Sequence, residues 1–317
     1  MPFPNLLALL FFLCFSSFSN AEPPGDKNDE MSVLVSADWL NRHLDDPDLV
    51  VLDCSIIVTQ EEDGTMQNLT GRSSYDSGHI PSAGFADLLE DLSDTDSPYL
   101  FKPPTPEQFA AAMSALGVGD ETRVVLYDNS NSAWAARVWW MLRWIGFDNA
   151  ALLDGGLNAW KAQNLPLSTD APTRPVRELS IAIRPELIAD RDEVLAAIND
   201  DSTRIIDALP GAHYRGDFAM YARPGHIVSA ENRSIALLQD ENGRYRTEKE
   251  LATMFTGDRN TRAITYCGGG IAASSVAFTM HRLGFSNISV YAASLQEWAE
   301  NPENPMETVD PMDWQDD

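Results

Sequence analysis

The chain has few positive charges, few cysteines and no long apolar run beyond its N-terminus. Its 317 residues include 22 Lys and Arg against 48 Asp and Glu, which gives a formal net charge of -26 at pH 7. A surface of this sign repels the phosphates of nucleic acids and anionic lipid head groups, so we expect neither as a partner. We interpret the acid excess as a solubilising surface, and the length favours two domains.

The one apolar run of note covers residues 6–18. It is too short to span a membrane but suits the core of a signal peptide, and the small residues at 19–21 suit cleavage after Ala21. We therefore predict a signal peptide over residues 1–21, a periplasmic or secreted product, and no membrane insertion after leader removal. No Lys or Arg precedes Lys27, and a cytoplasmic product that starts at Met31 is the alternative.

Only three cysteines are present: Cys14 in the predicted leader, then Cys54 and Cys267. Two cysteines so far apart make no disulfide framework. The sequence has no CxxC and no Cys/His cluster, so we expect no metal and no cofactor. Cys54 follows an apolar run at 49–52 and is expected to be a half-buried residue at a strand end.

The sequence contains an internal repeat in which the same motifs return in the same order. GHIPSA at 78–83 returns as GHIVSA at 225–230, and RVVLYDNS at 123–130 returns as RAITYCGG at 262–269. This match places Asp128 opposite Cys267. Apolar runs typical of buried strands alternate with helical patterns in each half, which predicts parallel sheets with helices on both faces. We place the two α/β domains at 32–166 and 180–303, joined by a polar, Pro-containing linker.

The segment TYCGGGIAASS at 265–275 holds the more informative cysteine. Cys267 ends a predicted strand, and ligands of parallel sheets gather at the carboxyl ends of strands. Gly268, Gly269 and Gly270 can curl so that their N–H groups point inward, and Ile271 and Ala272 open a helix whose positive end faces the same spot. A thiolate there is stabilised, which favours nucleophilic chemistry at sulfur. The alternative is an ordinary strand-to-helix turn with a buried thiol.

These residues resemble the rhodanese family of sulfurtransferases in its tandem two-domain form, over about Val33–Trp298. LDGGLNAW at 153–160 and the two GHI motifs look like family signatures, and an inactive first domain with Asp128 before a catalytic second one is the family's usual arrangement. The resemblance implies that Cys267 accepts a sulfane sulfur as a persulfide. The donor would be a small anion, thiosulfate or 3-mercaptopyruvate, and the acceptor a thiol or cyanide.

Several positions depart from the family's patterns. Thiosulfate-specific members carry basic residues directly after the cysteine, and mercaptopyruvate-specific members have a serine where this chain has Gly269. The histidine associated with that serine is replaced by Phe101, whereas Asp87 matches its acidic partner. The family's Tyr-Asp-Gly-Ser is here Tyr-Ala-Ala-Ser at 291–294.

The resemblance also implies which side chains bind the anionic donor. One family arginine aligns with His213, and a second corresponds to Arg223. Arg215 is a further candidate cation. For all three the alternative is a surface or structural role, in which the arginines pair with the many acids.

Two histidines and two aspartates recur in both halves, including the half without the cysteine. His79 and His226, like Asp53 and Asp207, are therefore expected to serve the fold rather than the reaction. A tryptophan-rich helical segment at 134–144 is expected to face the core or the other domain, because no basic residues interleave it as nucleic-acid binding would need.

Two other functions compete with sulfur transfer by catalysis. A phosphatase with a cradled cysteine needs an arginine six positions after that cysteine, and Ala273 stands there, which argues against this reading. A non-catalytic sulfur-carrier or partner-binding module stays open, because several polar groups of the donor pocket are missing.

Overall fold

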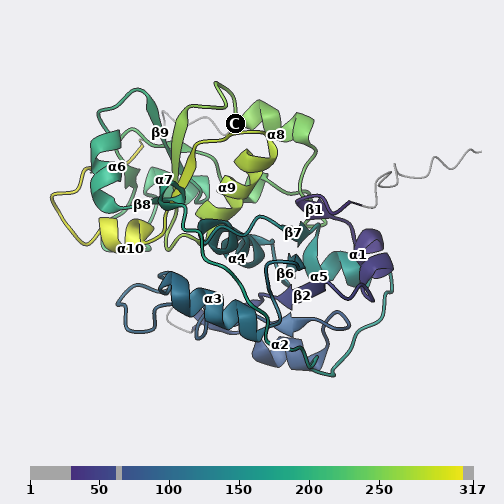
Figure 1. The fold of residues 1–317 in the computed structure, drawn as a ribbon. Helices are drawn as coiled ribbons and strands as arrows, with labels where there is room; N and C mark the ends of the chain where they lie inside the picture. The colour runs from purple at the N-terminus through teal and green to yellow at the C-terminus, as the bar shows by residue number, and fades with distance from the viewer. Residues whose placement is uncertain (1–29, 62–65, 310–317) are drawn as a thin grey trace, which may run out of the picture. The chain divides into compact units, whose positions relative to one another are not determined.

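The computed structural model describes residues 30–61 and 66–309, and these contain two five-stranded parallel sheets (Figure 1). The strands of the first, in spatial order, are β1 (Leu34–Val35), β7 (Ala150–Leu153), β6 (Arg123–Tyr127), β2 (Leu49–Asp53) and β5 (Gly84–Phe85). The strands of the second are β11 (Glu231–Asn232), β9 (Thr203–Asp207), β12 (Arg262–Tyr266), β13 (Ile288–Tyr291) and β8 (Ile188–Ala189). The two orders are the same when read in opposite directions, which confirms the internal repeat.

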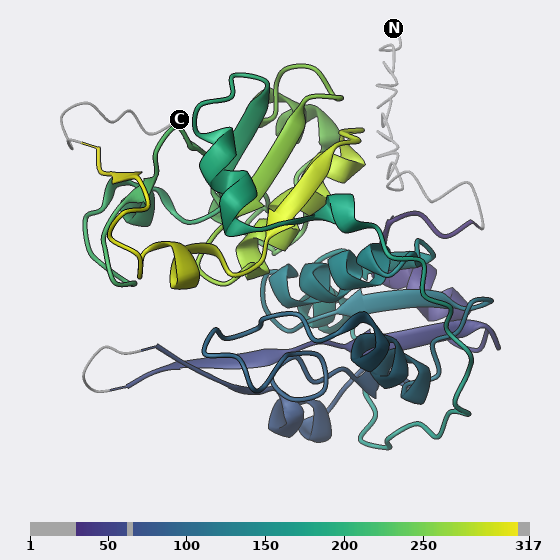
Figure 2. The same ribbon diagram turned by 60° about the vertical axis from the view of Figure 1, so that its left-hand side comes forward.

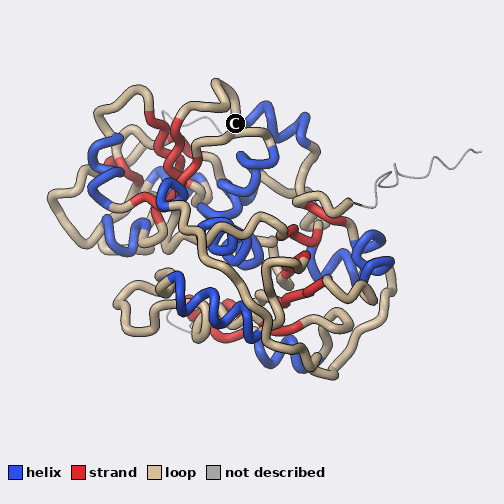
Figure 3. Tube along the Cα trace, viewed as in Figure 1, coloured by secondary structure: helices blue, strands red, loops and turns tan. Residues whose placement is uncertain are grey.

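Helices connect the strands, as the alternating pattern predicts (Figure 3). The first half contains α1 (Ala37–His43), α2 (Arg72–Ser77), α3 (Pro106–Ala115), α4 (Ala133–Trp144) and α5 (Gly156–Ala162). The second contains α6 (Arg191–Ala197), α7 (Gly211–Arg215), α8 (Glu248–Met254), α9 (Ile271–Arg282) and α10 (Ser294–Trp298), with 3-10 turns at Pro185–Leu187 and Ile235–Leu237. None of the helices in the described ranges is long and apolar enough to cross a membrane.

Helices cover both faces of each sheet. Because successive residues of a strand point to opposite sides, neighbouring residues pack against different helices. In β2, Val50 and Leu52 join the cluster that includes α3 and α4, whereas Val51 joins the cluster that includes α1 and α5. In the second half, Ile206 faces α8 and α9, and Ile205 faces α6 and α10. Strands buried on both faces explain why their sequences are continuous apolar runs rather than alternating ones.

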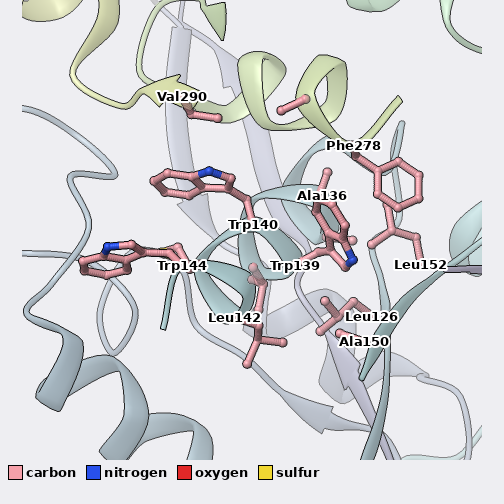
Figure 4. Close-up of a cluster of buried hydrophobic side chains, with 14 of the residues drawn as sticks. Leu126, Ala136, Trp139, Trp140, Leu142, Trp144, Ala150, Leu152, Phe278 and Val290 are labelled. Carbon is pink, nitrogen blue, oxygen red and sulfur yellow. The ribbon is translucent and has the colours of Figure 1, made fainter. Parts of the chain in front are cut away.

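Helices α4 and α9 pack against each other and join the two halves through one buried cluster. Trp139 of α4 meets Phe278 of α9 edge-on, with ring centroids 4.9 Å apart. Figure 4 shows Trp139 and Trp140 between the strands of the first half and Val290 of the second. The expectation that the tryptophan-rich segment faces the core and the other domain is confirmed. Because α4 follows Asp128 and α9 follows Cys267, this packing also brings the two loops of the repeat together.

The residues that recur in both halves have the same surroundings twice. His79 and His226 are buried, each stacks on a tyrosine, and the Nδ1 of each bonds a backbone carbonyl oxygen. The carboxylates of Asp53 and Asp207 each accept the N–H two residues further on. These contacts hold the turns of the fold, as the repeat predicts.

Two pairs of antiparallel strands were not predicted from the sequence. Strands β3 (Ile56–Gln60) and β4 (Met66–Thr70) form an arm that runs out from the first sheet (Figure 2). Strands β10 (His226–Ile227) and β14 (Met306–Glu307) pair in the second half, so ordered structure continues past the predicted boundary at residue 303. The bounds 32–166 and 180–303 stay predictions. The predicted signal peptide at 1–21 lies outside the described residues.

Candidate active site

Cys267 directly follows β12, at the carboxyl end of a central strand, as predicted. The loop 268–270 then leads into α9, and the N–H of Gly270 donates to the Cys267 Sγ over 3.1 Å. Gly270 has φ of +81°, and a Cβ added there would lie 2.8 Å from the Ala292 carbonyl oxygen. Glycine is therefore required at this position to turn a backbone donor toward the sulfur.

The start of α10 holds the cysteine loop from its other side. The Ser294 Oγ accepts the N–H of Cys267 over 3.1 Å. The N–H groups of Leu295 and Gln296 donate to the carbonyl oxygens of Cys267 and Gly268 over 3.1 and 3.0 Å. These bonds fix the loop before any substrate arrives, which is the kind of preorganisation that catalysis needs. Sequence reasoning missed this role of Ser294, although the motif at 291–294 drew attention to the segment.

Two side chains crowd the glycines that depart from the family's loop patterns. A Cβ added at Gly268 would lie 1.6 Å from the Tyr221 hydroxyl, and one added at Gly269 would lie 2.2 Å from Gln296 Nε2. Any larger residue at either position therefore needs its neighbour to move. Burial raises the pKa of Tyr221, and the negative charge of a Cys267 thiolate raises it further. The Tyr221 hydroxyl thus stays protonated at neutral pH, beside the cysteine loop.

Cys267 lines a pocket of about 1000 Å³ to which both halves contribute. The first half supplies residues of the β3–β4 arm, the 100–101 loop and the start of α4; the second supplies the cysteine loop, His213 and the 218–221 segment. Cys267 itself is 2% exposed. Among the lining residues in the described part of the chain there is no Asp, Glu, Lys or Arg.

A buried arginine of the first half lies beneath the cysteine loop. Arg137 of α4 is inaccessible to solvent, and a Cβ added at Gly270 would lie 2.9 Å from its Nη1. The Nη2 donates to the Phe101 carbonyl oxygen over 2.6 Å, whereas Nε and Nη1 have no hydrogen-bond partner. Burial lowers the pKa of Arg137 to about 10, and the negative charge of Cys267 opposes that fall. The group is therefore still a cation at neutral pH. Sequence reasoning missed it.

The predicted donor-binding residues separate into two groups. His213 lines the pocket, with its ring against Phe218 at a centroid distance of 4.4 Å, and burial lowers its pKa. Gly268, Gly269, Ile271 and Ala272 also line the pocket, and Gly270 contacts the sulfur through its N–H.

The two arginines predicted to bind the donor do not line this pocket. Arg223 donates to the carbonyl oxygens of four residues near the end of α10, namely Trp298, Ala299, Asn301 and Asn304. Arg215 forms a two-bond ion pair with Asp217. Their predicted contact with the donor has not been tested, and the geometry gives each a structural partner instead.

The other residues singled out by the resemblance lie as follows. Phe101 lines the pocket, packs on Trp134 and adopts a left-handed φ of +59°. Asp87 lies away from the pocket lining and accepts hydrogen bonds from Thr70 Oγ1 and from the N–H groups of Leu89 and Glu90.

Cys54 is fully buried rather than half-buried, because the residues around the end of β2 are covered on both faces. Burial raises the pKa of its thiol well above the ordinary value. Within the described residues, no group of three or more His, Cys, Asp or Glu side chains is arranged to hold a metal ion.

Comparisons with known proteins agree with this architecture. A model of the rhodanese-like domain matches twice, at residues 36–163 and 190–301. The chain is 34% identical over 285 residues to a 3-mercaptopyruvate sulfurtransferase of Escherichia coli strain K12, covering 87% of this chain and 98% of that protein. It is 31% identical to "Thiosulfate/3-mercaptopyruvate sulfurtransferase 1, mitochondrial" of Arabidopsis thaliana, covering 93% of this chain and 80% of that protein.

Solved structures show the same fold. The crystal structure of the Escherichia coli 3-mercaptopyruvate sulfotransferase SseA matches with a TM-score of 0.74 at 34% identity, over 83% of this chain and 99% of that one. A structure of EanB in complex with ergothioneine matches with a TM-score of 0.75 at 23% identity, over 88% and 70% of the two chains, and shares the fold. The two domain matches and these relatives together show that the chain belongs to the rhodanese family, as a tandem-domain sulfurtransferase.

Proposed function

We propose that Cys267 carries the sulfur in this enzyme, taking it from thiosulfate or 3-mercaptopyruvate and passing it to a thiol or cyanide. The observation that carries the proposal is the position of Cys267: its sulfur accepts a backbone N–H of the glycine loop and borders a large pocket. The family membership and the names of the relatives support the choice of donors.

The geometry supports a two-step exchange. The Cys267 thiolate attacks the sulfane sulfur of the donor, the bond from that sulfur to the rest of the donor breaks, and its electron pair leaves with sulfite or with the enolate of pyruvate. The product is a persulfide on Cys267. An acceptor then attacks the outer sulfur, and Sγ leaves as the thiolate. The Gly270 N–H stabilises the anionic sulfur in both steps, because a backbone donor held in place strengthens with developing charge.

Arg137 supplies a cation beside a pocket whose described lining contains no Lys or Arg. Its two unpartnered nitrogens and its position under Gly270 give it a role in balancing the charge of the cysteine sulfur. A cation that is buried without an anion is costly, and a thiolate or persulfide anion nearby relieves that cost. Arg137 is in this sense a positioning residue that acts on the loop from below.

The donor preference follows from the loop. The Cys-Gly-x-Gly sequence resembles the mercaptopyruvate type, and Asp87 matches, but Gly269 and Phe101 remove the serine and histidine of the specialists. We propose weak activity with either donor and a slight preference for 3-mercaptopyruvate. The proposed donor contacts that border the pocket are His213 and the backbone N–H groups of Gly268, Gly269, Ile271 and Ala272, with the Gly270 N–H at the sulfur.

A cyanolysis assay tests the assignment, with thiosulfate and 3-mercaptopyruvate in parallel. Cys267→Ser is expected to abolish thiocyanate formation with both donors, and mass spectrometry of the wild-type protein treated with donor is expected to show one added sulfur on Cys267. Cys54→Ser is the matched control and is expected to keep most of the activity, because that thiol is buried away from the pocket. Turnover retained by Cys267→Ser would contradict the proposal.

A sulfur-carrier function is the second candidate, and one relative favours it. The chain is 30% identical to "Sulfur carrier protein TtuD" of Thermus thermophilus, over 84% of this chain and 93% of that protein. The absence of Asp, Glu, Lys and Arg from the described pocket lining agrees with a low affinity for small anionic donors. A carrier would hold a persulfide on Cys267 yet turn over neither donor with cyanide, so the same two measurements separate the candidates.

For localisation, we propose export after removal of residues 1–21. The apolar run and the small residues before the cleavage position support it. N-terminal sequencing of protein from fractionated cells tests it, and a cytosolic chain that begins at Met31 would reverse it.

A further inference from the structure

The pocket beside Cys267 is larger and less polar than a small anionic donor requires. Both proposed donors have only a few heavy atoms, whereas a pocket of about 1000 Å³ is of the size that holds a drug-sized ligand. Most of this space is therefore free when a donor reacts at the sulfur. The second substrate of the exchange, the acceptor, is the molecule left to fill it.

The free part of the pocket is apolar. Five of its side chains are large, apolar and about half exposed, with exposed fractions between 46% and 54%: Val58, Met66, Leu100, Phe218 and Met220. They come from the β3–β4 arm, the loop before α3 and the loop after α7. Exposed apolar side chains that gather from separate segments around a reactive group are typical of a ligand site.

Beyond the cysteine loop, which has Arg137 beneath it, the described lining of the pocket offers no counterion. No described lining residue is Asp, Glu, Lys or Arg, and burial lowers the pKa of His213, which keeps its ring neutral at neutral pH. Arg215 and Arg223, the arginines predicted to bind the donor, bond Asp217 and four backbone carbonyl oxygens instead. A charged acceptor body would lose hydration here without gaining a partner, and the overall charge of -26 adds repulsion for anions.

We infer that the acceptor is a low-molecular-weight thiol whose body is uncharged and largely apolar. The inference rests on the proposed persulfide of Cys267. A small molecule fits better than the surface of a folded partner, because Cys267 is only 2% exposed within the pocket. Neutral polar groups at Asn68, Asn131 and Gln296 can orient such a molecule.

The transfer is balanced without any further reactant. The acceptor thiolate attacks the outer sulfur of Cys267–S–SH, the bond between that sulfur and Sγ breaks, and Sγ leaves as a thiolate. The acceptor becomes R–S–SH and keeps the hydrogen of the outer sulfur. The apolar lining contacts the body of the acceptor while its sulfur reaches the cysteine loop.

A matched pair of thiols tests the inference. Benzyl mercaptan and 4-(mercaptomethyl)benzoate share a reacting thiol and a ring, and they differ by one carboxylate on the far side of the ring. With 3-mercaptopyruvate as donor, kcat/KM for benzyl mercaptan is expected to exceed that for the carboxylate by about tenfold, mainly through KM. Equal values for the two thiols, or saturation by a cysteine-containing peptide but not by benzyl mercaptan, would overturn the inference.

Two lysine substitutions localise the effect. Met220→Lys places a cation in the pocket at a half-exposed position and is expected to reverse the preference toward 4-(mercaptomethyl)benzoate. Val176→Lys adds the same charge at a residue that is 74% exposed and outside the pocket lining, and it is expected to leave the preference unchanged. An unchanged preference in Met220→Lys would contradict the proposed binding surface.

Cyanide separates failure of this inference from failure of the proposed function. If thiocyanate forms but the two thiols give equal kcat/KM, the inference of an apolar acceptor is wrong and the proposed Cys267 persulfide still stands. If no thiocyanate forms and no sulfur is added to Cys267, the proposed function itself is wrong.

Discussion

The two halves use the same loop, after the same strand, to hold two different groups. In the first half Asp128 follows β6, and its carboxylate accepts four backbone N–H groups, from Ser130, Ser132, Trp134 and Ala135. In the second half Cys267 follows β12, and its sulfur accepts one, from Gly270. The first loop is thus occupied by its own side chain, whereas the Cys267 sulfur takes up a single backbone donor.

Loop length and composition account for this difference. Helix α4 begins five residues after Asp128, whereas α9 begins four residues after Cys267, and the shorter loop consists of three glycines. Because a carboxylate extends further from the backbone than a thiol, it reaches the N-terminal N–H groups of its helix and caps them. The comparison teaches that the loop is an anion site in both halves, and only the half with a short side chain leaves room for a transferable sulfur.

The largest expected effect follows from removing the occupant of each loop. Asp128→Ala leaves four buried backbone donors without an acceptor and is expected to lower the free energy of unfolding by about 3 kcal/mol. Cys267→Ala removes one N–H···S contact and is expected to lower it by less than about 1 kcal/mol. Denaturant unfolding followed by circular dichroism measures both. Equal losses would break the distinction between an occupied and an open loop.

The second prediction concerns Asp53 and Asp207, which end the equivalent strands β2 and β9. Burial raises the pKa of Asp207 to about 7, although hydrogen bonds from the Leu209 N–H and from Tyr266 act to lower it. The native state therefore binds the proton of the Asp207 carboxyl more tightly than the unfolded state does. The contribution of Asp207 to the free energy of unfolding is greatest below about pH 4. It falls as the pH rises from about 4 to about 7.

Asp207→Asn is expected to remove that fall and to raise the free energy of unfolding at pH 8 by about 2 kcal/mol relative to the wild type. The amide oxygen can still accept the N–H of Leu209. Denaturant unfolding between pH 4 and pH 8 measures the slope. Asp53→Asn is the matched variant of the first half, where burial also raises the pKa. A wild-type slope retained in Asp207→Asn would assign the pH dependence elsewhere.

The third effect concerns the cation that the first half places under the second half's loop. Arg137→Met keeps the apolar volume but removes the charge, and it is expected to lower kcat/KM for sulfur transfer about tenfold. Alkylation of Cys267 by iodoacetamide at pH 7 is expected to slow as well, a change that a merely structural role would not produce. Arg137→Lys, which keeps the charge, is expected to recover part of both rates. If the rate of Cys267 alkylation is unchanged in Arg137→Met, Arg137 serves packing only.

Sequence reasoning predicted the parts of the molecule that depend on local pattern. Doubly buried strands give continuous apolar runs, amphipathic helices give their period, and the glycines after Cys267 mark a backbone turned toward the sulfur. The repeat then fixed the equivalence of Asp128 and Cys267. These features need only neighbouring residues, so the α/β fold and the cysteine loop were predictable.

The features that were missed depend on contacts between distant segments. Strands β3 and β4 lack a regular apolar alternation, with the patterns IIVTQ and MQNLT, because they are an arm rather than part of a covered sheet. Arg137 is a single charged residue in an apolar helix, and nothing in its neighbours indicates that it lies under a loop 130 residues further on. The spacing between motifs could not show that the described lining of the pocket would contain no Asp, Glu, Lys or Arg.

The smallest catalytic effect is expected at Arg223, where sequence and structure differ most. The resemblance predicts that Arg223 binds the donor, so its loss would lower kcat/KM tenfold to a hundredfold. The structure surrounds its guanidinium with four carbonyl oxygens from the end of α10 and the segment that follows it. Arg223→Ala is therefore expected to lower the free energy of unfolding by about 1–2 kcal/mol and to change kcat/KM by less than about threefold with either donor.

Steady-state kinetics with thiosulfate and 3-mercaptopyruvate, beside denaturant unfolding, tests these two accounts of Arg223. Arg215→Ala is the matched control, since it also removes an arginine that lies outside the pocket lining and bonds an acid of its own segment. A large loss of kcat/KM in Arg223→Ala but not in Arg215→Ala, with stability retained, would support the predicted contact between Arg223 and the donor. The 298–304 segment would then have to release the guanidinium when the substrate binds. Lost stability with intact turnover would instead leave donor binding to His213, the backbone of the cysteine loop and the buried charge of Arg137.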